Sequence, residues 1–239
     1  MAGAPRRYAV SMSDDGIAIE RGLPDDLRDQ AVDIFEEAFG SKMRSAVRDP
    51  EARREFMRRT YVAEHTLIAR RGPELLGMAG LGSKGGEYEG GLMGRSWDPR
   101  PYTDLLGWFG AIWAVWGMRL SDHRPKADEI YVDGIAVSPG ARGQGLGTRL
   151  LDEAVAIARD QGKRFVRLDV VDTNPRAQAL YARLGFTVTK VRSFGYSERQ
   201  LGFGGMTSME LPVPAEEPPD AEAAARRPPR SAADPAPGR

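Results

Sequence analysis

The chain has 239 residues, with 34 basic and 34 acidic side chains, no cysteine and two histidines. The balanced charge gives no reason to expect binding to nucleic acid or to an anionic membrane. The lack of cysteine excludes disulfides, thiolate metal ligands and a cysteine nucleophile, and two histidines do not predict a His-rich metal site. The first residues hold no apolar signal core, so we expect a cytoplasmic protein.

The two ends of the chain differ in composition from the interval between them. Residues 215–239 are rich in Pro, Ala, Glu and Arg and contain no large apolar side chain. Such a segment cannot bury enough apolar surface to offset the entropy lost on ordering. We therefore expect 215–239 and 1–13 to be disordered, and 14–214 to form a single domain.

The first half of this domain alternates between strand and helix patterns. Pro24 opens a helix whose first turn holds Asp25 and Asp26, where carboxylates suit the positive helix end, and Gly40 is expected to end it. Further patterns predict a strand at 17–21, a helix at 50–64, and strands at 66–71 and 75–81 joined by a Gly-Pro turn.

An insertion at about 84–127 begins with a glycine-rich stretch and contains all four tryptophans: Trp97, Trp108, Trp113 and Trp116. Its segment 105–120 is apolar, but it is shorter than the roughly 20 residues that span a bilayer, and it includes Arg119. We expect a helix over about 103–118 instead. Its apolar side chains lie on every face, so it packs against the sheet or a second subunit of a homodimer, or forms an aromatic lid over a substrate site.

The second half has the clearest periodicity. It predicts strands at 130–137, 164–171, 186–191 and 206–211, and helices at 143–161 and 177–184. Together with the first half, this order predicts an α/β layer architecture around a mixed sheet.

A loop at 142–147 connects the strand at 130–137 to the following helix. It reads Arg-Gly-Gln-Gly-Leu-Gly, so three alternate glycines leave backbone N–H groups accessible at the positive end of a helix. These donors and the charge of Arg142 suit a phosphate or pyrophosphate. A dinucleotide-binding fingerprint would instead have G-x-G-x-x-G in the first strand–helix unit. A glycine-tolerant turn without a ligand is the remaining alternative.

This Arg/Gln-x-x-Gly-x-Gly loop resembles the pyrophosphate loop of the GNAT superfamily, the acyl-CoA-dependent N-acyltransferases. The preceding Ile-Ala-Val-Ser-Pro resembles that family's central strand and turn, and NPRAQALYARLGF at 174–186 resembles its downstream segment. The resemblance covers about 17–211 and is strongest over 130–186. It implies an α/β (α+β) fold, in which a mixed, mostly antiparallel central sheet with a splayed central strand is flanked by helices.

The resemblance also implies acetyl-CoA as co-substrate and no metal. The pantetheine arm would pair with the backbone of Ile135 and Val137, and the pyrophosphate would bind the N–H groups of the loop. The implied cofactor-binding residues are Ile135, Ala136, Val137, Arg142, Gly143, Gln144, Gly145, Leu146, Gly147, Thr148, Asn174 and Tyr181. Asn174 precedes a proline, so a capping role at a turn is equally consistent with the sequence.

Direct attack of an amine on a thioester needs a proton acceptor for the amine and a proton donor for the leaving thiolate. Tyr181 resembles the family's donor, although its apolar neighbours also suit a core position. Glu129 and Asp133 are the two candidate bases. With Tyr131, they alternate on one strand face, and Ile135 and Val137 share that parity if the strand is continuous. Surface ion pairs are the alternative for both carboxylates.

The sequence says less about the acceptor substrate, which receives the acyl group, than about the cofactor. We expect the primary amine of a small molecule; the alternatives are a peptide or protein N-terminus or lysine, a non-catalytic acyl-CoA-binding module, and a Rossmann-like binder. Besides the insertion, the glycine- and aromatic-rich segment 193–206 is expected to border the acceptor site through Tyr196 and Phe203.

Overall fold

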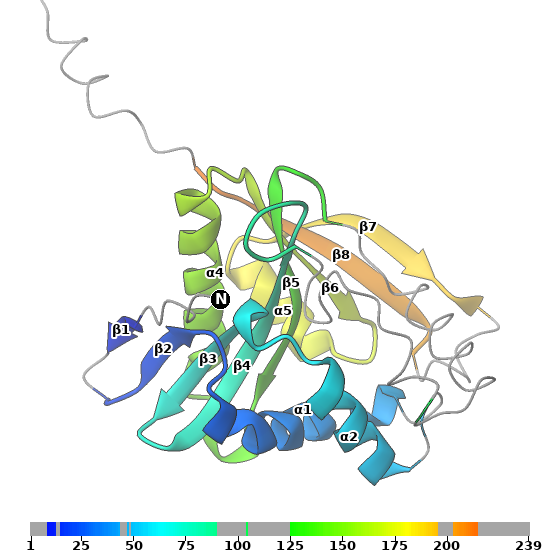
Figure 1. Ribbon diagram of the computed structural model, residues 1–239. Coiled ribbons are helices and arrows are strands. Elements are labelled where there is room, and N and C mark those ends of the chain that lie inside the picture. Colours follow the sequence, from blue (N-terminus) through cyan, green and yellow to red (C-terminus); the bar gives the residue numbers. More distant parts are fainter. Residues whose placement is uncertain are drawn as a thin grey trace, which may run out of the picture.

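The computed structural model describes residues 9–12, 15–43, 47, 49–89, 104, 125–195 and 203–214. They form an eight-stranded sheet with helices on both faces (Figure 1). The elements in chain order are β1 (Ala9–Met12), β2 (Ala18–Arg21), η1 (Asp25–Leu27), α1 (Arg28–Met43), α2 (Pro50–Thr60), η2 (Ala63–His65), β3 (Thr66–Arg71), β4 (Glu74–Ser83), β5 (Glu129–Val137), η4 (Pro139–Ala141), α4 (Leu146–Asp160), β6 (Phe165–Val171), α5 (Pro175–Arg183), β7 (Thr187–Ser193) and β8 (Gly205–Pro212).

The strand order across the sheet is β1-β2-β3-β4-β5-β6-β8-β7. Among the described strands, β5 and β6 are parallel neighbours and every other neighbouring pair is antiparallel. This arrangement confirms the fold class expected from the sequence, a mixed and mostly antiparallel sheet between helices.

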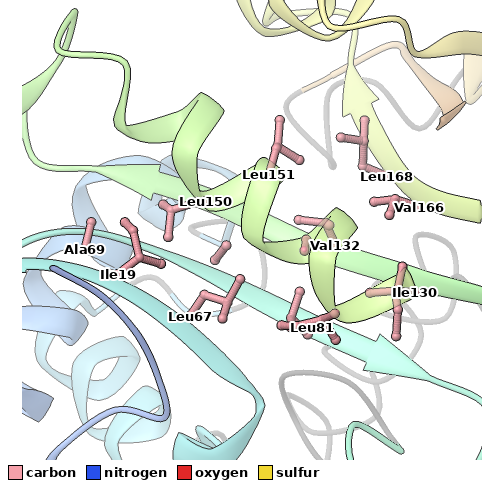
Figure 2. Packing of buried hydrophobic residues seen from close by; sticks show 14 of the residues in the cluster. Ile19, Leu67, Ala69, Leu81, Ile130, Val132, Leu150, Leu151, Val166 and Leu168 are labelled. Atoms are coloured by element: carbon pink, nitrogen blue, oxygen red, sulfur yellow. The ribbon is translucent and has the colours of Figure 1, made fainter. Parts of the chain in front are cut away.

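Two apolar cores lie on opposite faces of the sheet. On one face, α4 packs its buried leucines against the strands, and α5 adds partly buried side chains at the edge of the same core (Figure 2). On the other face, α1 and α2 cover β3 and β4, and Ala136 of β5 joins that core. Side chains alternate between the two faces of a strand, so each residue of β5 and β6 faces one helical layer or the other.

Helix α1 does not end at Gly40, as its sequence had suggested, but continues to Met43. A Cβ atom added at Gly40 would lie 2.5 Å from the carboxylate of Glu36, which occupies that space while it pairs with the buried Arg53 of α2. The glycine therefore makes room for an ion pair between two helices, and it does not terminate the first one. Helix α2 ends at Thr60, earlier than expected, and a short 3-10 turn follows.

The N-terminal segment is also more ordered than expected. Within 1–13, which composition predicts to be disordered, Ala9–Met12 form β1 and pair antiparallel with β2. The tail 215–239, most of the insertion including its four tryptophans and expected helix, and Tyr196 lie outside the described residues. Within the described part of the chain, no helix is long and apolar enough to cross a membrane.

Candidate functional site

Strands β5 and β6 separate partway along their length. Their pairing runs from Glu129 opposite Phe165 to Val132 opposite Leu168 and then stops. Beyond this point β5 stays paired with β4 as far as Val137, while β6 stays paired with β8. The backbone edges that face each other across the gap are thus not paired with each other or with another described strand, and they can pair with an extended ligand.

A β-bulge lies at the start of this gap. Asp133 and Gly134 together oppose the single residue between Ala79 and Leu81 of β4. Gly134 has a φ of 136°, which a side chain would strain, and an added Cβ would lie 3.3 Å from the ring of Phe39. A bulge of this kind bends the strand, so it helps β5 to turn away from β6.

The bulge corrects the side-chain parity that the sequence suggests for β5. Val132 belongs to the core under α4, so Tyr131 and Asp133 face the layer of α1 and α2. After the extra residue the alternation shifts: Ile135 packs toward the α4 core, whereas Ala136 belongs to the core of α1 and α2. Ile135 and Val137 therefore do not share a face with the acidic side chains.

A cavity occupies the gap between the two strands. From the α1 face it is lined by Phe39, and from the α5 face by Asn174, Ala177 and Tyr181. The remaining lining residues come from the separated strands: Val132, Gly134, Ile135, Leu168, Asp169, Val170 and Val171. Because residues from both helical layers line it, we call this cavity the slot; groups on either face of the sheet border it.

The loop at 142–148 lies at the N-terminus of α4. Gly143 and Gly145 have φ values of 82° and 76°, and no other residue approaches within 4 Å of where their Cβ atoms would lie. The first bond of the helical ladder runs from the N–H of Arg149 to the carbonyl of Gly145 at 3.1 Å. The N–H groups of the three preceding helical residues thus lack partners within the helix, and they form an anion-binding end.

The side chains of this loop differ in their partners. Arg142 is half exposed; its Nε donates to the carbonyl of Val137 at 3.1 Å, and its terminal nitrogen pairs with Glu37 of α1. Gln144 donates to the carbonyl of Gly140 at 3.2 Å, Leu146 is buried, and Thr148 is half-buried. The backbone N–H groups, with the positive end of α4, are therefore the groups best suited to hold a pyrophosphate.

Asn174 and Tyr181 come from α5. The Oδ1 atom of Asn174 caps this helix by accepting from the N–H of Ala177 at 3.2 Å, and the residue also lines the slot. Tyr181 packs against Phe186, with ring centroids 5.9 Å apart, and burial raises the pKa of its hydroxyl to about 12. A phenol with that pKa stays protonated near neutral pH and can donate a proton inside the slot.

The two candidate bases have different environments. Glu129 is completely buried at the start of β5; it lies 3.3 Å from Arg167 and accepts from the backbone N–H of Lys126 at 2.9 Å. Asp133 is exposed and lies at the bulge, beside the slot. Of the two carboxylates, Asp133 is the one placed at the gap.

Sequence reasoning missed three residues near the slot: Phe39, Asp169 and Arg192. In β6, charged Arg167 and Asp169 alternate with the buried Val166, Leu168 and Val170. Charged residues at every second position of an interior strand mark a polar face, and that signal was available in the sequence. Among the described residues, no group of three or more His, Asp or Glu side chains could hold a metal ion.

A model of the acetyltransferase (GNAT) family matches residues 26–186. Streptothricin acetyltransferase of Streptomyces lavendulae is 28% identical over 136 residues, which cover 54% of this chain and 67% of that protein. Mycothiol acetyltransferase of Beutenbergia cavernae is 42% identical over 84 residues, but the match spans 27% of its length. Thialysine N-epsilon-acetyltransferase of Bos taurus is 42% identical over 60 residues, 35% of its length.

The fold agrees with this match. The solved structure of a GCN5-related N-acetyltransferase from Kribbella flavida superposes with a TM-score of 0.54 and 20% sequence identity, covering 84% of this chain and all of that one. At this identity the likeness supports the fold, including the mixed sheet between helices.

Proposed function

Since the chain belongs to the acetyltransferase (GNAT) family, we propose that it transfers an acetyl group from acetyl-CoA to the primary amine of a small molecule by direct attack. The observation that carries this proposal is the slot between β5 and β6. Its strand edges have no sheet partner among the described strands, Tyr181 lines it on the α5 side, and Asp133 lies beside it at the bulge of β5.

The described residues suit acetyl-CoA, which the family uses as acetyl donor. The helix N-terminus and the two positive-φ glycines offer backbone donors for a pyrophosphate. Beyond Val132 and Leu168 the facing edges of β5 and β6 are not paired with each other, which supports our proposal that the amide-containing pantetheine arm binds beside Ile135, Ala136 and Val137. In this arrangement Asn174 contributes its side-chain amide while it also caps α5.

The chemistry then follows from the two faces of the slot. The amine nitrogen bonds to the acetyl carbonyl carbon as the carbon–sulfur bond breaks. An amine that enters as an ammonium ion loses two protons: Asp133 passes one to solvent before the attack, and solvent takes the other from the nitrogen afterwards. Tyr181 protonates the departing sulfur and recovers its proton from solvent, so the products are an amide, a thiol and one proton. We assign Glu129 to the fold, because its burial and its pairing with Arg167 separate it from the slot.

Three of the relatives are named for small molecules, namely streptothricin, mycothiol and thialysine, which favours a small-molecule acceptor. Another relative, from Bacillus subtilis, is named for an alanine of a ribosomal protein and is 32% identical over 71 residues. A peptide or protein acceptor is therefore the second candidate.

Calorimetry with acetyl-CoA and with NAD, followed by a thiol-release screen of amines and peptides, tests the proposal. We expect the protein to bind acetyl-CoA but not NAD, and to release thiol from acetyl-CoA when small primary amines are present. Thiol release with peptides but not with small amines would favour the second candidate, a peptide or protein acceptor. Binding without release from any acceptor would make the chain a non-catalytic acyl-CoA-binding module, and a lack of acetyl-CoA binding would overturn the proposal.

A further inference from the structure

Asp169 of β6 has one carboxylate oxygen without a hydrogen-bond donor. Its side chain is 6% exposed, and its Oδ2 atom accepts from Arg192 at 2.8 Å. Its Oδ1 atom is buried and makes no hydrogen bond of normal geometry with a described residue, although the hydroxyl of Tyr131 lies near this carboxylate. Buried carboxylate oxygens normally accept a hydrogen bond, and this one borders a cavity, so it is positioned to accept from a ligand.

The position of Asp169 places this oxygen at the slot. The last pair between β5 and β6 is Val132 with Leu168, so Asp133 and Asp169 are the first residues after the strands part. Both side chains lie on the face of α1 and α2, since Val132 and Leu168 belong to the opposite core. Asp169 also lines the slot itself.

Tyr131 lies near both carboxylates. Burial, followed by the charges of Asp133 and Asp169, raises the pKa of its hydroxyl well above the ordinary value. Tyr131 precedes both acids on the same face and therefore forms the floor between them. The opening of the slot on this side is thus bordered by two negative groups.

The two neighbouring arginines are each paired with a carboxylate. Arg192 pairs with Oδ2 of Asp169, and Arg167 lies between Glu129 and Glu210. The described side chains thus leave Oδ1 of Asp169 as an acceptor in a site where negative charge predominates. A positively charged N–H donor is the ligand that this site fits, because charge-assisted hydrogen bonds are the stronger class.

We propose that Asp169 binds the acceptor substrate as an ammonium ion, with Asp133 on the other side of the slot. This inference rests on the proposed function and narrows the acceptor to alkylamines that are protonated near neutral pH. Weakly basic arylamines and neutral alcohols of the same shape are expected to bind poorly. Asp169 is therefore a binding residue for the acceptor, distinct from Tyr181, which faces the departing sulfur.

The substitution Asp169→Asn tests the proposal, because it keeps the shape and removes the charge. With the alkylamine that gives the highest kcat/KM in the thiol-release screen, we expect KM to rise about 10–100-fold, which is the usual range for a charge-assisted hydrogen bond. The Kd of acetyl-CoA should stay unchanged. Asp160→Asn is the matched control, since Asp160 lies 67% exposed at the end of α4 and makes a long surface pair with Arg21.

A second measurement needs no variant and therefore does not depend on the folding of Asp169→Asn. With coenzyme A bound, the wild-type protein should bind the same alkylamine at least about 10-fold more tightly than the alcohol of identical skeleton. Equal affinities, or a KM within twofold of wild type for a folded Asp169→Asn protein, would overturn the inference and leave acetyl transfer standing. If the wild-type protein releases no thiol with any amine, the proposed function itself fails.

Discussion

The two halves of β5 perform different tasks. The first half, 129–132, is buried and paired with strands on both sides, and its carboxylate at Glu129 is enclosed with Arg167. The second half, 133–137, is paired on one side only, and its carboxylate at Asp133 is exposed at the slot. One strand thus carries a carboxylate enclosed in the sheet and, four positions later, a carboxylate exposed beside the slot.

Sheet pairing, and not residue type, separates these two acids. A strand that is hydrogen-bonded on both sides has no backbone groups to offer to a ligand, whereas the edge exposed by the splay does. The bulge at Gly134 marks the boundary. Variants in each half should therefore fail in different ways, with effects on stability in the first and on turnover or binding in the second.

The largest expected effect is on catalysis at the slot. Tyr181→Phe should lower kcat by about 100-fold, which is typical for loss of a general acid, with little change in the Kd of acetyl-CoA. The raised pKa of about 12 means that the phenol is protonated throughout the assay range. The wild-type pH–rate profile should therefore show no falling limb from Tyr181 below about pH 11. A falling limb near pH 9 that disappears in Tyr181→Phe would contradict the raised pKa of the Tyr181 hydroxyl.

The next effect is on stability in the first half of β5. Glu129→Gln leaves the buried Arg167 with Glu210 as its remaining partner, so the free energy of unfolding should fall by about 3 kcal/mol. Denaturant unfolding measures the loss. The matched control is Asp128→Asn in the adjacent position, whose pair with Arg164 is exposed and should change stability by less than about 1 kcal/mol. Equal losses of unfolding free energy in the two variants would show that the buried Glu129 contributes no more to stability than the exposed Asp128.

A smaller effect is expected at the loop. Gly145→Ala forces a side chain into a positive φ and disturbs the N-terminus of α4, so the Kd of acetyl-CoA should rise about 10-fold. Gly162→Ala is a control for the strain, because Gly162 has a φ of 63° just beyond the C-terminus of the same helix and is equally uncrowded. Both variants should lose about 1 kcal/mol of stability. A similar rise in Kd for both would show that strain alone weakens binding.

The smallest effect separates the two roles of Asn174. Asn174→Ser keeps a capping oxygen for α5 and removes the amide N–H group, so stability should change by less than about 0.5 kcal/mol. If the amide contacts the cofactor arm, the Kd of acetyl-CoA should rise about threefold, as expected for one neutral hydrogen bond. An unchanged Kd would leave Asn174 with its capping role only.

Local patterns allowed much of this molecule to be predicted. The strands, α4, the glycine loop and Tyr181 could be recognised because each depends on residues within one or two turns. The bulge could not be predicted, since it depends on the residue of β4 that opposes Asp133 and Gly134. The role of Gly40, which leaves room for the ion pair between Glu36 and Arg53, likewise depends on a second helix. The alternation of β6 marked Asp169 as part of a polar face, but its place next to the gap depends on where β5 and β6 separate.

The most direct test of this account measures kcat/KM of Asp133→Asn and Glu129→Gln in one thiol-release assay, with each value corrected for the folded fraction. Asp133→Asn should lose about 100-fold, as expected for removal of a general base, while Glu129→Gln should stay within about threefold of wild type. The opposite pattern, with Glu129→Gln inactive although folded and Asp133→Asn active, would place the proton acceptor in the buried half of β5 and contradict the account.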